Sequence, residues 1–75
     1  MNTKELTTTD GVFTEFENLI NTSIVLSFGK YNNTVIVKLE SKDGFTKQPI
    51  QYIFTSLNLQ NIFIRLLEDN RHSTN

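Results

Sequence analysis

The chain has 75 residues, a formal net charge of −1 and no cysteine. This length corresponds to one small domain, near the lower limit for an independent hydrophobic core. The lack of cysteine excludes disulfides, thiolate metal sites and a thiol nucleophile. The nearly balanced charge gives no strong field to attract nucleic acid or an anionic membrane.

Residues 1–9 are mostly polar, and after Met1 only Leu6 is a sizeable apolar residue. We therefore expect a flexible N-terminal arm. The polar residues 1–5 do not resemble a secretory signal. No segment approaches the roughly 20 apolar residues of a membrane span. The expected location is cytoplasmic, with no membrane partner.

A helix is predicted from residue 10 to about Asn21, because Thr9 or Asp10 can accept a hydrogen bond from a first-turn amide. Apolar residues recur at helical spacing and form one stripe: Val12, Phe13, Phe16, Leu19 and Ile20. A strand over residues 12–16 is the alternative, because short alternation fits the same residues.

Residues 34–40 are rich in β-branched side chains and alternate cleanly, which predicts the central strand of a sheet. Turn-forming pairs lie on both sides, Asn32 with Asn33 and Asp43 with Gly44. This arrangement predicts two successive hairpins.

The first hairpin would pair residues 23–31 with the central strand through a two-residue turn. In that register Phe28 lies opposite Val37, and Leu26 lies opposite Leu39. The apolar sets then share one face, whereas a slip of one residue would divide them.

The second hairpin would place Ile50 opposite Val37 and Tyr52 opposite Val35. Pro49 would lie in this third strand. Because proline cannot donate to a ladder, the strand is expected at the edge of the sheet. The turn itself can be longer than two residues, since residues 45–47 show no alternation.

A second helix is predicted from Ser56 or Asn58, either of which can be its cap, to about Asp69. Its core-facing stripe follows helical spacing: Leu59, Ile62, Phe63, Leu66 and Leu67. Asn70 can end this helix in a left-handed conformation. Residues 71–75 are then expected to form a frayed tail.

The prediction is an α+β domain over residues 10–70, of order α-β-β-β-α, with a three-stranded antiparallel meander. Both helices should cover one face of the sheet. That face would carry Ile24, Leu26, Phe28, Val35, Val37, Leu39, Ile50, Tyr52 and Phe54. Such a small core makes self-association a source of stability.

The sequence contains no catalytic constellation, so we expect neither an enzyme nor a cofactor. His72 is the only histidine, and a frayed tail does not give the fixed position that an acid or base needs. The three glycines are isolated, so no phosphate-binding loop is present. We expect no metal site.

In element order and length the chain resembles the double-stranded-RNA-binding domain. That family binds RNA through a basic run at the start of its last helix. Here residues 55–61 contain no lysine or arginine, so the resemblance covers topology only. The open sheet face would offer only Lys38, whereas sheet readers of DNA need arginines. Nucleic-acid binding is therefore not expected.

Binding to a larger protein is the remaining expectation. The candidate residues are four on the open sheet face and two at turns: Val25, Ile36, Lys38, Ile53, Tyr31 and Phe45. Edge strands can extend a partner's sheet, and exposed aromatic residues can anchor an interface. Single exposed apolar residues are also ordinary on solvated faces, and the aromatic side chains can instead fold over the core.

The expected function is that of a small non-enzymatic binding module. In general character it is similar to small phage or mobile-element proteins that block host enzymes, including CRISPR effectors, although no motif carries that similarity. A nucleic-acid-binding domain and a self-associating structural protein, such as a homodimer, are the alternatives.

Overall fold

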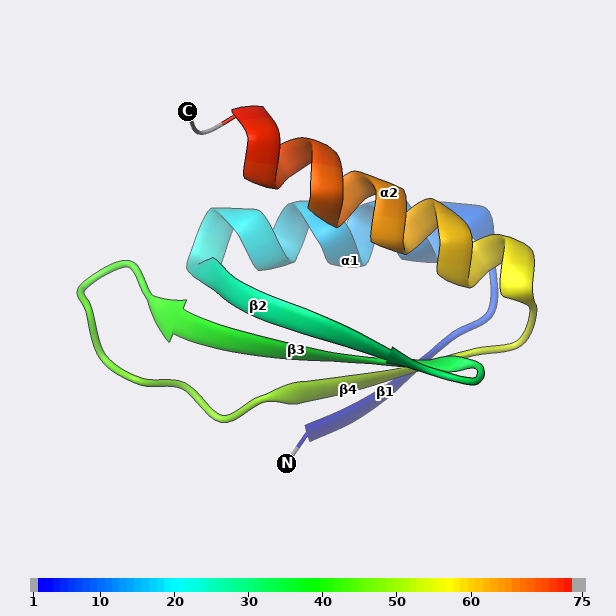
Figure 1. The fold of residues 1–75 in the computed structure, drawn as a ribbon, viewed down its shortest axis with the longest axis horizontal. Coiled ribbons are helices and arrows are strands. Elements are labelled where there is room, and N and C mark those ends of the chain that lie inside the picture. Colours follow the sequence, from blue (N-terminus) through cyan, green and yellow to red (C-terminus); the bar gives the residue numbers. More distant parts are fainter. Residues whose placement is uncertain (1, 74–75) are drawn as a thin grey trace.

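A computed structural model describes residues 2–73, which form two layers, a sheet beneath two helices (Figure 1). The elements are β1 (Asn2–Leu6), α1 (Thr9–Thr22), β2 (Ser23–Tyr31), β3 (Thr34–Ser41), β4 (Ile50–Phe54) and α2 (Leu57–Ser73). The sheet has four strands in the order β1-β4-β3-β2. The predicted α+β class is confirmed, and both helices lie on one face of the sheet (Figure 1).

The segment expected to be a flexible arm instead contains a strand. β1 pairs in parallel with β4, with Lys4 opposite Tyr52 and Leu6 opposite Phe54. The predicted three-stranded antiparallel sheet is therefore wrong in detail, because the sheet is mixed and has four strands. Only Leu6 of β1 is buried, so the segment lacks the apolar alternation by which a strand is recognised.

Because β1 lies beside it, β4 is an interior strand, and the prediction that it forms an edge is wrong. Pro49 lies just before β4, and its carbonyl accepts from the Asn2 amide at 3.4 Å. The proline thus needs no edge, since its missing N–H falls outside the ladder. The loop between β3 and β4 is longer than a two-residue turn, and Gly44 within it has a φ of 92°.

The predicted register is confirmed between β3 and β4 and in the part of β2 next to the first turn, and it fails further along β2. Val37 lies opposite both Phe28 and Ile50, as expected. Opposite Leu39, however, lies Val25, because the ladder shifts between Val25 and Ser27 and leaves Leu26 as a bulge. A bulge inserts one residue and reverses the facing of those beyond it.

Because of the bulge, three residues of β2 do not lie where the sequence predicted. Val25, expected on the open face, packs against the core. Ile24 and Leu26, expected in the core, are 46% and 50% exposed. The remaining residues predicted for the covered face are buried or partly buried: Phe28, Val35, Val37, Leu39, Ile50, Tyr52 and Phe54.

α1 is a helix, as predicted, so the alternative of a strand over residues 12–16 is wrong. The side chain of Thr8 caps it by accepting from the Gly11 amide at 2.9 Å, one residue before the predicted cap. Val12 and Leu19 are buried, but Phe13 is 44% exposed and does not belong to the core-facing stripe.

α2 is capped by Ser56, whose hydroxyl accepts from the Leu59 amide at 3.3 Å. Its predicted stripe is buried or partly buried. The helix continues to Ser73, past the predicted end at Asn70. The expected tail is therefore partly helical, and residues 74–75 lie outside the described part of the chain.

Candidate protein-binding surface

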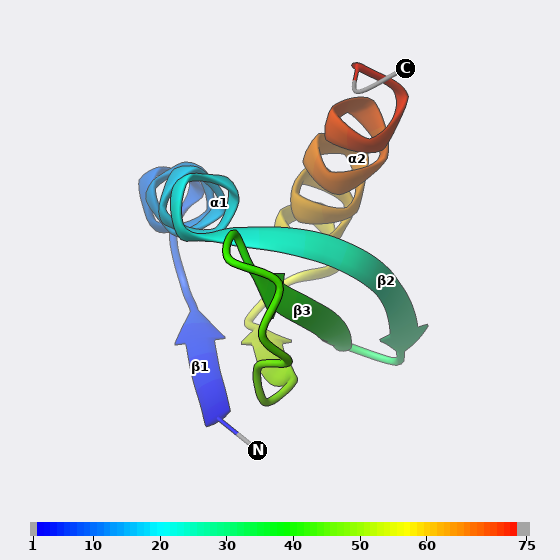
Figure 2. The same ribbon diagram turned by 90° about the vertical axis from the view of Figure 1, so that its left-hand side faces the viewer.

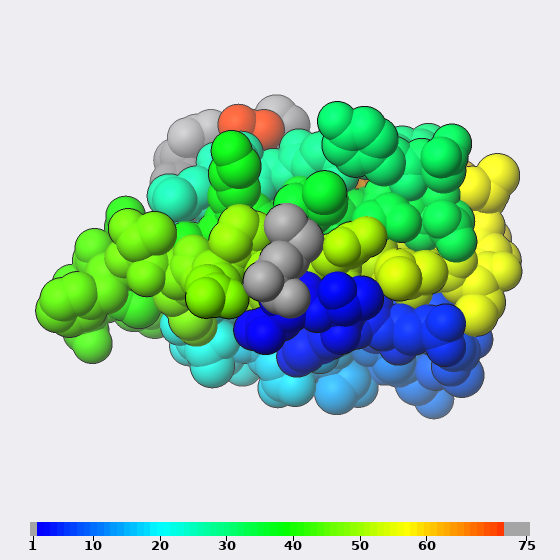
Figure 3. Space-filling model, turned by 90° about the horizontal axis from the view of Figure 1, so that it is seen from below, coloured from blue at the N-terminus to red at the C-terminus, as the bar shows by residue number. Residues whose placement is uncertain are grey.

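No helix or strand of the described residues 2–73 covers the face of the sheet opposite α1 and α2, and the strands lie side by side in Figure 3. Alternation places Ile36 and Ile53 on this open face, because Val35, Val37 and Tyr52 are buried on the other. Both isoleucines are partly buried, and Lys38 is exposed. Three of the predicted surface residues are thus on the expected face.

Gly29 lies opposite Ile36 in the neighbouring strand. A side chain added at Gly29 would meet no atom within 4 Å. Gly29 therefore places no side chain of its own beside Ile36.

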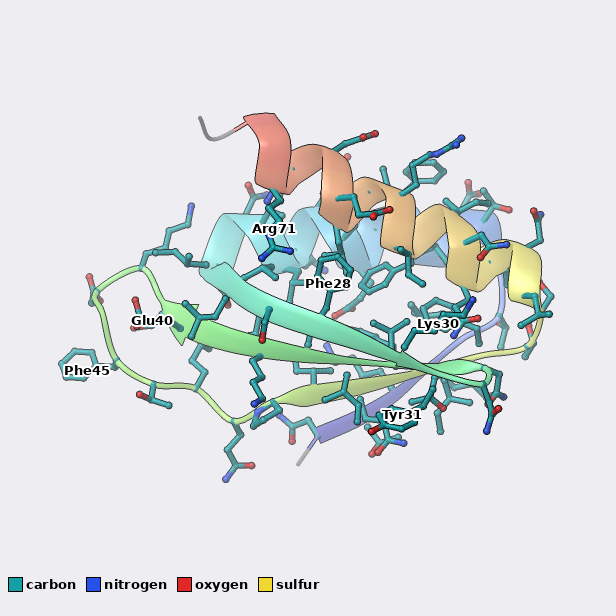
Figure 4. All side chains as sticks on the ribbon, in the orientation of Figure 1. Phe28, Lys30, Tyr31, Glu40, Phe45 and Arg71 are labelled. Carbon is teal, nitrogen blue, oxygen red and sulfur yellow. The ribbon has the colours of Figure 1, made fainter. Side chains whose placement is uncertain are left out.

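The two aromatic residues at turns lie far apart. Tyr31, at the end of β2, is 68% exposed and projects below the sheet, towards the open face (Figure 4). Phe45 is 74% exposed and projects from the β3–β4 loop at the other end of the molecule (Figure 4). Tyr31 can therefore belong to one surface with Ile36 and Ile53, whereas Phe45 cannot.

The base of the loop that carries Phe45 is held by backbone hydrogen bonds. The Ser41 amide donates to the Phe45 carbonyl at 2.7 Å, and the Phe45 amide donates to the Ser41 hydroxyl at 3.0 Å. Neither bond involves the ring, so the exposed aromatic side chain projects from a fixed backbone.

A groove runs along β2 that the sequence reading did not predict. It has a volume of about 340 Å³ and is lined by β2 from Ser23 to Phe28, together with Ile20, Lys42, and Leu67, Asn70 and Arg71 of α2. It is open because α2 packs over β3 and β4, and its C-terminal end rises away from the sheet (Figures 1 and 2). Of the predicted surface residues, Val25 lies in this groove and not on the open face.

Three of the large exposed hydrophobic residues belong to β2: Ile24, Leu26 and Tyr31. The sequence indicates that some apolar side chains of β2 must be exposed, because Ile24, Val25 and Leu26 are consecutive in a strand and cannot all face one core. The bulge decides which of them is turned inwards, and no residue type in the segment marks its position.

Gln60 is a buried polar residue that sequence reasoning also missed. Its side-chain amide donates to the carbonyls of Asn32 at 2.7 Å and Thr34 at 3.1 Å. These bonds tie the start of α2 to the β2–β3 turn, where Asn32 has a left-handed φ of 49°.

Three titratable groups form a structural cluster that runs from the buried Tyr52 to the exposed Lys4. The Glu15 carboxylate accepts from the Tyr52 hydroxyl at 2.9 Å and from the Lys4 ammonium at 3.0 Å. Burial, and then the neighbouring Glu15 charge, raise the pKa of Tyr52 far above its usual value. The cluster links α1 with β1 and β4 but does not face the groove.

Within residues 2–73, no three His, Cys, Asp or Glu residues gather closely enough to hold a metal ion. The side chain of His72 lies outside the described part of the structure. Neither described helix is long and apolar enough to cross a membrane.

Comparisons with protein-family models, curated proteins and solved structures give no match. A function must therefore be inferred from β2, its groove and the open face of the sheet.

Proposed function

We propose that this protein is a small binding module that acts by occupying the surface of a larger protein. The observation that carries the proposal is the clustering of exposed apolar side chains on β2. Ile24, Leu26 and Tyr31 are 46%, 50% and 68% exposed, and β2 is an edge strand. Scattered exposed apolar residues are ordinary, but their concentration along a sheet edge is typical of protein interaction sites.

Occupation of an enzyme's surface would make the protein an inhibitor. We propose this form of the function, of the kind that small phage or mobile-element proteins exert on host defence enzymes such as CRISPR effectors. A compact domain with exposed apolar residues and a net charge of −1 is suited to covering a protein surface, since it brings no strong field of its own.

Affinity capture from a host lysate tests the proposal. The parent chain should recover one protein reproducibly, and at least one of three variants should recover much less of it: Tyr31→Lys, Leu26→Lys, or the Ile36→Lys, Ile53→Lys double variant. Thr14→Lys, on an exposed part of α1, is the matched control and should capture as the parent does. Adding the parent chain to the recovered protein should lower that protein's activity.

Failure to recover any protein above the control level, or equal recovery by all variants, would overturn the proposal. Self-association is the second candidate, because the same free edge can pair with another copy. In that case light scattering would show a dimer for the parent chain and a monomer for Leu26→Lys, with no foreign protein captured.

A further inference from the structure

The outer edge of β2 has no strand beside it in the part of the chain that the structure describes. In an antiparallel ladder, part of each strand's backbone N–H and C=O groups point away from its neighbour. β2 is nine residues long, and Ser27–Tyr31 pairs regularly with β3. This half of β2 therefore offers an unbroken row of backbone groups to a further strand, and it meets the groove at Ser27 and Phe28.

The other edge of the sheet is protected by polar and charged side chains. β1 exposes Asn2, Thr3, Lys4 and Glu5, and charges on an edge strand oppose pairing with another chain. β2 carries only one charged residue, Lys30, among its nine. Of the two edges, β2 is the one suited to accept a strand.

The groove beside β2 supplies pockets for the side chains of such a strand. Its apolar lining includes Ile20, Val25, Phe28 and Leu67, and its volume of about 340 Å³ is near the lower end for ligand pockets. Lys42 and Arg71 also line it, and none of its lining residues is acidic. Arg71 extends from α2 towards β2 (Figure 4).

We propose that β2 accepts an extended segment of the partner protein as an additional strand. Apolar side chains of that segment enter the groove, and an Asp, Glu or C-terminal carboxylate lies beside Lys42. This inference rests on the proposed function and specifies the chemistry of the partner. A second copy fits less well, because its own β2 would bring Lys30 and no carboxylate to this positive end of the groove.

Selection of random displayed peptides of about ten residues, the upper range of strand lengths, tests the inference. The parent chain should enrich peptides with alternating apolar residues and at least one carboxylate. Leu26→Lys and Lys42→Glu should each weaken their binding about tenfold or more. Arg65→Glu makes the same charge change at an exposed position of α2 outside the groove and should leave binding unchanged, as should Thr3→Lys on β1.

A second measurement separates strand addition from simple contact with the groove. Alternate amides of an added strand point to β2, so N-methylation of the selected peptide in one phase should abolish binding, and in the other phase should preserve it. Circular dichroism of Leu26→Lys and Lys42→Glu confirms that the variants are folded; both changed residues are exposed in the parent.

The inference is overturned if no peptide is enriched, if both N-methylation phases bind alike, or if Leu26→Lys and Lys42→Glu bind the peptides as the parent does. A dimer that dissociates when peptide binds would assign the edge to a second copy instead. If the lysate partner is still captured by Leu26→Lys and Lys42→Glu, the proposed function stands and this inference fails. If peptides bind as expected but no protein is captured, the proposed function fails instead.

Discussion

The buried hydroxyl of Tyr52 connects three elements through one carboxylate. Tyr52 is fully buried, and a buried hydroxyl without a partner would destabilise the fold. Glu15 of α1 accepts this hydrogen bond and also the one from Lys4 of β1. A single acidic side chain thus positions a helix against the strand that the sequence pattern did not indicate.

We predict that part of the stability depends on the protonation of Tyr52. Its pKa is raised in the folded protein, so the unfolded chain loses this proton first, near pH 10. The contribution to stability is therefore complete below about pH 10 and is lost as the pH rises above it. Urea unfolding at about pH 8 and pH 11 measures the effect.

Tyr52→Phe should be less stable than the parent by about 1 kcal/mol at the lower pH, because one hydrogen bond is lost. At the higher pH the difference in free energy of unfolding between the parent and Tyr52→Phe should be smaller. The parent loses stability as Tyr52 titrates, whereas the variant has no hydroxyl to titrate at this position. Tyr31→Phe, at an exposed position, should match the parent at both pH values. If the stability difference between the parent and Tyr52→Phe is the same at both pH values, the stability does not depend on the protonation of Tyr52.

Val37 and Ile36 test the facing of the central strand. Val37 is fully buried between Phe28 and Ile50, so Val37→Asp places an unpaired charge in the core and should unfold the protein. Ile36→Asp, on the partly exposed opposite face, should change the melting temperature far less. Thermal unfolding followed by circular dichroism distinguishes them, and equal damage would mean that Ile36 is also covered.

At the level of elements, the sequence predicted the central strand and part of its pairing with each neighbour. Alternation and turn residues located β3, its register with β4, and the part of β2 next to the first turn. Beyond Leu26 the prediction fails, because a bulge adds one residue without a residue type that marks it. β1 was missed because its contribution to the sheet is mostly backbone pairing.

The sequence placed the open-face residues of β3 and β4 correctly but did not predict the groove beside β2. Ile36, Lys38 and Ile53 lie in strands whose register was correct, and their facing was correct too. Val25 was assigned to the wrong face because it lies beyond the bulge. The groove depends on both the bulge and the inclination of α2, which no local pattern encodes.

The contribution of β1 to stability can be measured through its one buried residue. Leu6 is 7% exposed and lies opposite Phe54. Leu6→Ala should lower the free energy of unfolding by about 2–5 kcal/mol, as other core truncations do. Thr3→Ala, at an exposed position of the same strand, should stay within about 0.5 kcal/mol of the parent.

Chemical denaturation of both variants checks this prediction. If Leu6→Ala were as stable as the parent, β1 would contribute nothing to the core. Residues 1–9 would then behave as the flexible arm that the sequence predicted.

For the whole molecule, the two sheet edges have opposite characters. The charged β1 edge opposes pairing, and the apolar β2 edge favours it. A sheet with one accepting edge can add a single strand but cannot propagate into an open-ended assembly. This asymmetry is compatible with a one-to-one complex with a larger protein.

The distribution of charge over the molecule leads to the last prediction, which concerns nucleic acids. α2 has no basic residue before Arg65, so its start cannot dock on phosphates as a basic helix start does, and the net charge is −1. We expect no binding to duplex RNA or DNA at about 0.15 M salt. Below this concentration, any binding should be weak and should fall steeply as salt is added, since it would depend on counterion release.

Fluorescence anisotropy of a labelled duplex of about 20 base pairs, longer than the roughly 16 that a double-stranded-RNA-binding domain spans, checks this over a salt series. Lys42→Glu and Lys38→Glu are a useful pair, because each replaces a positive charge with a negative one on a different side of the molecule. Submicromolar binding at physiological salt would overturn the prediction. A loss of that binding with Lys42→Glu alone would then assign the β2 groove to a phosphate backbone and not to a protein strand.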